Sequence, residues 1–163
     1  PRKRRAKSMI YTVPSKYYLV RGCAEGFTTL NAFDSALLNA GVGNTNLVRM
    51  SSILPPKCER IAPVKLPQGA LVPVAYSTID STRPGEVITA AVAIAYPTDE
   101  DHCGLIMEYH EAAPKDVVEE KVCRMAEEGM HFRGQTIKRV EIAAAEHTVE
   151  NTGAAFAAVV LWN

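Results

Sequence analysis

Strand-like segments far outnumber helix-like segments in this chain, and this ratio limits the possible folds more than any single motif does. Apolar residues recur at helical spacing over residues 30–40 and 115–128. Runs rich in β-branched and aromatic residues, separated by turn signals such as Arg83-Pro84-Gly85, fill much of the remainder. Two helices against many strands with short turns predict an α+β layered sandwich rather than a doubly wound parallel sheet.

Several of the expected strands follow one another with only short turns between them. Small alanines within residues 86–95 indicate that this part of the sheet is tightly covered. The last two strands are expected to form a hairpin that turns around residues 150–153. The expected strands are residues 17–23, 46–54, 70–78, 86–95, 104–110, 135–149 and 154–162.

Both predicted helices carry signals at their ends. Gly41 follows the first helix as a natural terminator, which puts Asp34 on a helix. Pro114 opens the second helix, and Gly129 is expected to end it.

The charge balance excludes several classes of partner. Lys plus Arg and Asp plus Glu both number 18, which gives no electrostatic reason to expect nucleic acid, a membrane or a strongly acidic partner. A basic block at residues 2–7 is interpreted as part of a disordered tail over residues 1–9, with RNA binding as the alternative. An apolar content of 47% over 163 residues predicts a single domain, residues 10–163.

The chain is expected to be soluble and cytoplasmic. Its basic start leads into residues 8–21, where Lys16 and Ser15 interrupt the apolar core that a secretory signal needs. The longest apolar runs are too short to span a bilayer. The four cysteines form no Cys-x-x-Cys pair and the four histidines have no metal-ligand spacing, so reduced thiols and no metal are expected.

A Ser-Ser pair at positions 51 and 52 allows a distinctive peptide-bond chemistry. Attack of the Ser52 hydroxyl on the Ser51 carbonyl converts the amide into an ester, whose oxygen then leaves by β-elimination. Residue 52 passes through dehydroalanine, and hydrolysis leaves a pyruvoyl group there and an ordinary carboxylate on Ser51. Serine is common, so the pair alone carries little information and its surroundings decide its meaning.

Those surroundings contain several motifs in a fixed order. They are residues 31–41 (NAFDSALLNAG), 44–56 (NTNLVRMSSILPP), 65–73 (KLPQGALVP), 103–109 (CGLIMEY), 140–150 (VEIAAAEHTVE) and 154–162 (AAFAAVVLW). In order and spacing the chain resembles the pyruvoyl-dependent arginine decarboxylases. The resemblance covers nearly the whole chain from about residue 10 onward.

The resemblance implies a four-layer αββα sandwich with largely antiparallel sheets. It also implies a homo-oligomer, a trimer or a dimer of trimers, with active sites at subunit interfaces. The chain would cleave itself into residues 1–51 and 52–163, and the pyruvoyl group derived from Ser52 would replace pyridoxal phosphate as the cofactor. The implied reaction is a lyase reaction that converts L-arginine to agmatine and carbon dioxide through a Schiff base with the substrate.

Residue roles follow from chemistry together with the motif matches. Glu108 follows an apolar stretch, where desolvation favours the protonated form, and it matches the family's catalytic glutamate, so it is the candidate acid. Asp34 matches the family motif, and its carboxylate suits a guanidinium through two parallel hydrogen bonds. The alternatives are a strand glutamate that faces water and a helix-surface aspartate.

Further residues are candidates for substrate binding and for the cleavage step. Leu30 and Leu38 are candidates to line the aliphatic stem of the substrate beside Ser51, with plain core packing as the alternative, favoured for Leu38. Asn46 is a candidate oxyanion donor when Ser52 attacks, or else a strand or turn cap. Gly43, together with Asn44, is expected to allow a sharp backbone path through positive φ.

Two other functions stay open from the sequence. One is the same pyruvoyl chemistry on another amino acid, such as histidine or ornithine. The other is a catalytically silent oligomeric scaffold or RNA-binding protein that uses the basic block at residues 2–7.

Overall fold

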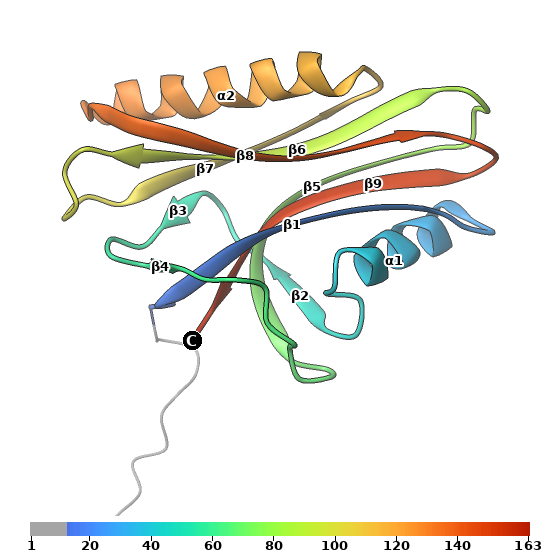
Figure 1. Ribbon diagram of the computed structural model, residues 1–163, viewed down its shortest axis with the longest axis horizontal. Helices are drawn as coiled ribbons and strands as arrows, with labels where there is room; N and C mark the ends of the chain where they lie inside the picture. The colour runs from blue at the N-terminus through green and yellow to red at the C-terminus, as the bar shows by residue number, and fades with distance from the viewer. Residues whose placement is uncertain (1–12) are drawn as a thin grey trace, which may run out of the picture.

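The computed structural model describes residues 13–163, which form two helices and nine strands in four layers. Helix α1 covers one sheet, helix α2 covers the other, and the two sheets face each other in the middle (Figure 1). The expected four-layer αββα sandwich is therefore confirmed. The elements are β1 (Lys16–Glu25), α1 (Thr29–Asn39), β2 (Asn46–Arg49), β3 (Ile53–Leu54), β4 (Glu59–Arg60), β5 (Leu71–Ser81), β6 (Val87–Pro97), β7 (Gly104–Glu111), α2 (Lys115–Phe132), β8 (Ile137–Thr148) and β9 (Gly153–Trp162).

The sheets are largely antiparallel. The sheet beside α1, called sheet A, has the order β2-β5-β9-β1-β4, and the sheet beside α2, called sheet B, has the order β3-β7-β6-β8. All pairs in sheet B and the central pairs of sheet A are antiparallel, while the two edge pairs β1·β4 and β2·β5 are parallel.

Strand β6 shows how the sequence packs these layers. Its alternate residues Ala91, Ala93 and Ala95 lie in the cluster under α2, while Val92 and Ile94 lie in the cluster between the two sheets. Because a strand alternates its faces, the small alanines let α2 approach closely while the larger side chains fill the middle layer. The expectation of a tightly covered sheet is confirmed, since residues 88–95 are buried throughout.

Helix α1 packs on sheet A with a narrow apolar stripe. Ala32, Ala36 and Leu37 are buried, and the helix begins at Thr28, whose side chain accepts a hydrogen bond from the Asn31 N–H. A Cβ on Gly22 of β1 would lie 2.4 Å from the Ala36 carbonyl oxygen, so this strand residue must be small. The prediction that Asp34 lies on a helix is confirmed.

The expected single strand over residues 46–54 is wrong. This segment forms β2 in sheet A and β3 in sheet B, with residues 50–52 crossing between the sheets. The hydrogen-bond partners differ on the two sides, since β2 pairs with β5 and β3 pairs with β7. An apolar run reveals the strand conformation but not the sheet to which each part belongs.

The expected hairpin between the last two strands is also wrong. Strand β8 pairs with β6 in sheet B, whereas β9 pairs with β1 and β5 in sheet A, so residues 149–152 connect the two layers. The short turn is real, but the strands on either side of it belong to facing sheets.

Gly129 does not end the second helix. Helix α2 continues to Phe132, and the turn that follows contains Gly134 with a φ of 65°. Gly129 is buried inside the helix, and a Cβ there would lie 2.3 Å from Leu105 Cδ2 of β7. The glycine serves close helix–sheet packing. The expected tail over residues 1–9 lies outside the described residues.

Candidate active site

The Ser51-Ser52 bond lies where the chain leaves sheet A for sheet B. The Met50 N–H donates to the Val74 carbonyl of β5 at 2.8 Å, and the Ser52 carbonyl accepts from the Ile106 N–H of β7 at 2.7 Å. The two sides of the bond are therefore anchored on different sheets. Ser51 is exposed and Ser52 is half-buried, so the bond lies at the surface and not in the core.

Glu108 lies on the same face of β7 as Ile106, whose N–H binds the Ser52 carbonyl. Ile53 pairs with Leu105 in the β3–β7 register, which sets Ser52 opposite Ile106. Ile106 packs in the cluster between the sheets, and Glu108, two residues further along β7, shares its face. Two residues along a strand span about 7 Å, so Glu108 lies within reach of a small molecule held at residue 52.

The two oxygens of the Glu108 carboxyl have different surroundings. Oε1 accepts a hydrogen bond from Arg49 Nη2 at 3.3 Å, whereas Oε2 is buried and has no partner among the described residues. Burial raises the pKa of Glu108, and the neighbouring Arg49 guanidinium opposes part of this effect. The expected environment for a protonated acid is thus present.

Arg49 is a contact of the site that the sequence analysis missed. It is the last residue of β2, and its guanidinium lies over the ring of Tyr76, 4.5 Å from the centroid. Its Nη2 also donates to the Tyr76 carbonyl at 3.0 Å. Nothing in the sequence distinguishes this arginine from an ordinary charged residue at the end of a strand.

The outer face of α1 carries three of the candidate residues. Leu30, Asp34 and Leu38 follow one another at intervals of four, which aligns them along one side of the helix. All three are exposed, with 73% of Leu30 and 51% of Leu38 accessible, so core packing does not account for either leucine. Asp34 makes no side-chain hydrogen bond or ion pair with the described residues.

Asn46 lies at the opposite end of β2 from Ser51. Its Nδ2 donates to the Gly69 carbonyl at 3.1 Å at the start of β2, while Ser51 follows the other end of that strand. Five residues of extended chain span about 16 Å, so Asn46 and the Ser51-Ser52 bond of one chain are well separated. The role of Asn46 as an oxyanion donor stays a prediction.

Gly43 serves this region in a different way from the one expected. Neither Gly43 nor Asn44 has positive φ, and among the described non-glycine residues only Lys57 does. A Cβ on Gly43 would lie 2.6 Å from Leu38 Cδ2, so the glycine makes room for the exposed leucine of α1. The loop that leads from α1 to β2 therefore packs against Leu38 on the outer face of the helix.

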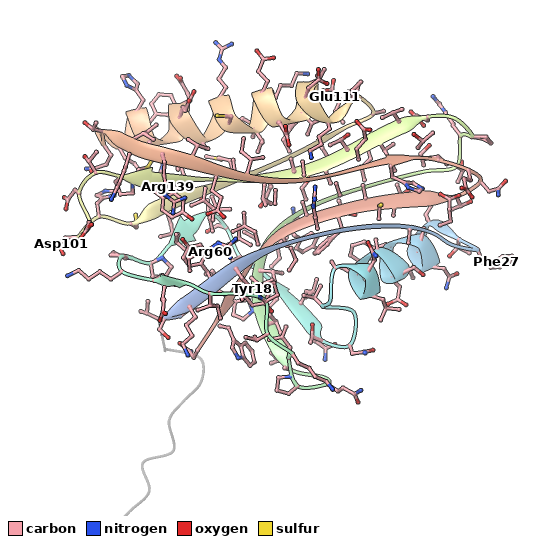
Figure 2. The ribbon with its side chains drawn as sticks, in the orientation of Figure 1. Tyr18, Phe27, Arg60, Asp101, Glu111 and Arg139 are labelled. Carbon is pink, nitrogen blue, oxygen red and sulfur yellow. The ribbon has the colours of Figure 1, made fainter. Side chains whose placement is uncertain are left out.

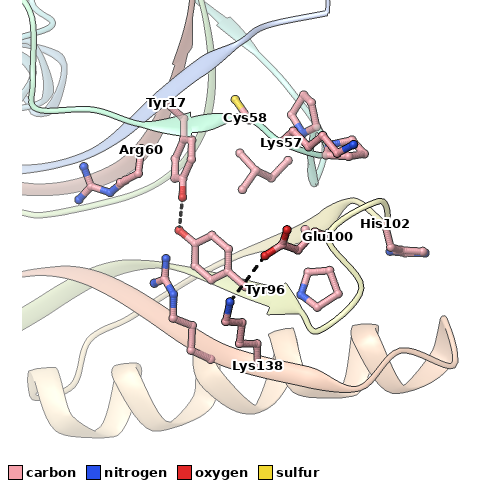
Figure 3. Close-up of a pocket in the computed structure, with 14 residues that line it drawn as sticks. Tyr17, Lys57, Cys58, Arg60, Tyr96, Glu100, His102 and Lys138 are labelled. Atoms are coloured by element: carbon pink, nitrogen blue, oxygen red, sulfur yellow. Dashed lines mark hydrogen bonds and ion pairs between the residues drawn. The ribbon is translucent and has the colours of Figure 1, made fainter.

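A cavity of about 330 Å³ begins two residues beyond Ser52, at Leu54 and its strand partner Gly104, and is lined by none of the candidate site residues. Figure 3 shows the Tyr17 and Tyr96 hydroxyls meeting at its centre, 2.6 Å apart. Arg60 and Arg139 reach into the space between the sheets from opposite sides (Figure 2) and both bind the Glu141 carboxylate. These polar groups satisfy one another, so we interpret this region as a bridge between the sheets.

The described residues give no sign of two other kinds of site. No group of three or more His, Cys, Asp or Glu side chains within residues 13–163 is arranged to hold a metal ion. No helix in the same part of the chain is both long enough and apolar enough to cross a membrane.

An αββα sandwich with a Ser-Ser bond at its surface and a buried, unpaired carboxyl oxygen nearby is the arrangement expected of an enzyme that makes its cofactor from its own serine. A family model described as "Pyruvoyl-dependent arginine decarboxylase" matches residues 16–163. The chain belongs to this family, whose cofactor is a covalently bound pyruvoyl group.

Curated relatives support the assignment over nearly full length. The pyruvoyl-dependent arginine decarboxylase of Methanocaldococcus jannaschii is 53% identical over 93% of this chain and 92% of its own. Those of Methanococcus maripaludis strain C5 and Pyrococcus abyssi are 47% and 41% identical, over 93% and 94% of this chain and 93% and 99% of their own. A solved pyruvoyl-dependent histidine decarboxylase is similar with a TM-score of 0.48 at 14% identity, over 61% of this chain and 53% of its own.

The residues around the Ser51-Ser52 bond fit a pyruvoyl group at position 52. The Ile106 N–H can bind the carbonyl of residue 52 whether that residue is a serine or a pyruvoyl group, because the conversion changes the amino group, the α-carbon and the side chain but keeps that carbonyl. The unpaired Glu108 Oε2 offers a buried polar partner on the same face of β7. Nothing bulky or charged from the described residues binds the Ser52 hydroxyl.

Proposed function

We propose that this chain is a self-processing decarboxylase that converts L-arginine to agmatine and carbon dioxide. The observation that carries the proposal is the position of the Ser51-Ser52 bond, which crosses between the sheets beside the unpaired, buried oxygen of Glu108. Cleavage there leaves residues 1–51 and 52–163, with the cofactor at the start of the second fragment.

The residues of this chain then have separate tasks. The pyruvoyl group, when present, binds the substrate amine and draws electrons from the α-carbon as carbon dioxide leaves. Glu108 donates a proton to that carbon and regains one from water, a task that suits a carboxyl group whose pKa burial has raised. The Ile106 N–H keeps residue 52 in place on β7 during both steps.

Recognition of the substrate guanidinium falls to Asp34. Its carboxylate is exposed between Leu30 and Leu38, so a guanidinium can pair with it while the aliphatic stem lies along the two leucines. An exposed carboxylate without a partner among residues 13–163 is suited to a ligand that arrives from outside the chain.

We further propose that two copies of the chain complete each active site. The residues divide into one group with Ser51, Ser52 and Glu108 and a second group with Asp34 on α1 and Asn46 at the start of β2. The exposure of Leu30 and Leu38 supports contact of the outer face of α1 with the first group of a neighbouring copy. A trimer, or a dimer of trimers, is the assembly that the family resemblance implies.

Intact-mass measurement of the purified protein, with a carbon dioxide release assay on the same sample, tests the self-processing. We expect two fragments that end at Ser51 and begin with a pyruvoyl group at position 52, and release from arginine that exceeds release from histidine or ornithine. Ser52→Ala should abolish cleavage and activity together. A fully active preparation of uncleaved chain would refute the mechanism, and a preference for another amino acid would refute the substrate.

Mixing two variants tests the shared site, at an arginine concentration so far below the raised KM of Asp34→Asn that each variant alone is almost inactive. The Asp34→Asn and Glu108→Gln variants are each expected to cleave themselves, because neither side chain binds the Ser51-Ser52 peptide bond. If each site takes its two groups from different copies, co-expressed variants should form some sites with both groups intact and regain part of the wild-type rate. Mixtures that stay as inactive as the separate variants would place all the groups in one copy.

A further inference from the structure

We infer that Arg49 is a positioning residue for Glu108, which it holds by Oε1 so that Oε2 carries the proton used in the reaction. This inference rests on the proposed role of Glu108 as the acid. It assigns a task to a side chain that otherwise resembles an ordinary surface arginine, since 56% of its side chain is exposed.

Three contacts fix the guanidinium of Arg49. It lies over the ring of Tyr76, 4.5 Å from the centroid, and Nη2 donates both to the Tyr76 carbonyl at 3.0 Å and to Glu108 Oε1 at 3.3 Å. The backbone beneath it is held as well, because Arg49 pairs with Val74 in the β2–β5 register. A cation stacked on an aromatic face and bonded to a main-chain carbonyl loses much of the rotational freedom of a free surface arginine.

The contact with Arg49 makes the two Glu108 oxygens unequal. A guanidinium has only donors, and the carbonyl oxygen of a neutral carboxyl is a better acceptor than its hydroxyl oxygen, so the oxygen that faces Arg49 is the carbonyl oxygen. When Glu108 is neutral its proton therefore lies on Oε2, which is the buried oxygen without a partner among the described residues. A buried polar atom without a partner costs about 1–3 kcal/mol, and a bound substrate would relieve that cost.

No other charged group contacts this carboxyl within residues 13–163. The strand partner of Glu108 on β6 is Val92, which is apolar, and Tyr76 of β5 contributes its ring and carbonyl to Arg49. Arg49 is also the only charged neighbour that acts on the pKa of Glu108 there. Its removal should therefore change both the direction and the proton affinity of the acid.

The first experiment measures the titration of Glu108 in protein that cannot cleave itself. In a Ser52→Ala background with ¹³C-labelled glutamate side chains, Glu108→Gln identifies the Glu108 signal in the NMR spectrum. We expect Arg49→Met to raise the titration midpoint of that signal, since the cation favours the charged form and methionine keeps only the apolar stem. Arg21→Met is the matched control, because Arg21 also donates to a main-chain carbonyl, that of Ala144 at 3.1 Å, away from Glu108. An unchanged midpoint in Arg49→Met would overturn the inference.

The second experiment measures kcat and KM for arginine across pH in cleaved enzyme. We expect Arg49→Met to lower kcat by roughly 10- to 100-fold, with a smaller change in KM, and to shift the alkaline limb of kcat/KM to higher pH. Arg49→Lys keeps the positive charge but lacks the planar guanidinium, and its kcat should lie between those of Arg49→Met and wild type. A wild-type kcat, or a rise in KM alone, would show that Arg49 does not position the acid.

The two experiments separate this inference from the proposed function. If the wild-type protein neither cleaves nor releases carbon dioxide, the proposed function fails, while the titration still reports whether Arg49 controls Glu108. If the wild-type protein is active and the titration midpoint does not depend on Arg49, the inference alone fails.

Discussion

Tyr96 connects the two sheets through a chain of hydrogen bonds, and its loss should destabilise the fold more than loss of its partner Tyr17. The Tyr96 hydroxyl donates to Glu141 Oε2 at 2.7 Å and lies 2.6 Å from the Tyr17 hydroxyl. Because the single proton of Tyr96 is used toward Glu141, Tyr17 must be the donor between the two tyrosines. The chain thus runs from Tyr17 on sheet A through Tyr96 to Glu141 on sheet B.

The direction of these hydrogen bonds determines how much free energy of unfolding each variant should lose. Tyr96→Phe removes a hydrogen bond to a charged group, worth about 1.5–3 kcal/mol, and leaves the Tyr17 hydroxyl without its acceptor, for about 1–3 kcal/mol more. Glu141 keeps Arg60 at 2.9 Å, so the two effects should overlap at about 2–4 kcal/mol in total. Tyr17→Phe removes one neutral hydrogen bond and should cost only about 0.5–1.5 kcal/mol.

Urea unfolding of uncleaved Ser52→Ala protein, at one fixed protomer concentration, measures these differences. The double variant Tyr17→Phe/Tyr96→Phe should lose less free energy of unfolding than the sum of the two single variants. The reason is that it leaves no Tyr17 hydroxyl without an acceptor. Tyr109→Phe is the control, since within residues 13–163 its hydroxyl meets only the surface side chains Lys121, at 3.4 Å, and Glu111, and should matter by less than about 0.5 kcal/mol. Equal losses for the two tyrosines, or strictly additive ones, would refute the assigned direction.

Two further predictions concern the helices. Gly129→Ala should lower stability by about 1–3 kcal/mol in thermal unfolding, because its Cβ would lie 2.3 Å from Leu105 Cδ2, although alanine favours a helix; a more stable variant would mean that Leu105 can move aside. Asp34→Asn should raise the KM for arginine by roughly 10- to 100-fold without affecting self-cleavage, through loss of a charged partner. An unchanged KM would show that Asp34 is an ordinary helix-surface residue that does not bind the substrate.

The sequence was sufficient to predict the two helices and the long strands because their signals are local, whereas the two-residue strand β4 (Glu59–Arg60) was not expected. Apolar spacing identifies α1 and α2, and β-branched and aromatic runs identify the long strands. Partner choice is not local. The run over residues 46–54 looks like one strand, yet Met50 bonds to β5 and Ser52 to β7, so the division depends on main-chain partners more than twenty residues away. The failed hairpin between β8 and β9 has the same cause.

The candidate site shows the same limit at the level of side chains. The motifs supplied Ser52 and Glu108, and the β3–β7 register brings them to one face. They supplied Asp34 and Asn46 equally well, yet these residues lie on a different surface of the chain. Arg49 was missed because a single charged residue at a strand end carries no distinguishing pattern, and its contacts with Tyr76 and Glu108 exist only after three segments have folded together.

The topology also explains how the fold can survive a cut between Ser51 and Ser52. The first fragment contributes β1, which lies inside sheet A and pairs with β9 of the second fragment from Lys16↔Trp162 to Glu25↔Gly153. It also contributes α1, which packs on that sheet, and β2, which pairs with β5. Each new chain end keeps its anchor, Met50 on sheet A and residue 52 on sheet B. The bond is thus placed where its loss frees a reactive end at the surface while the main-chain hydrogen bonds on both sides remain.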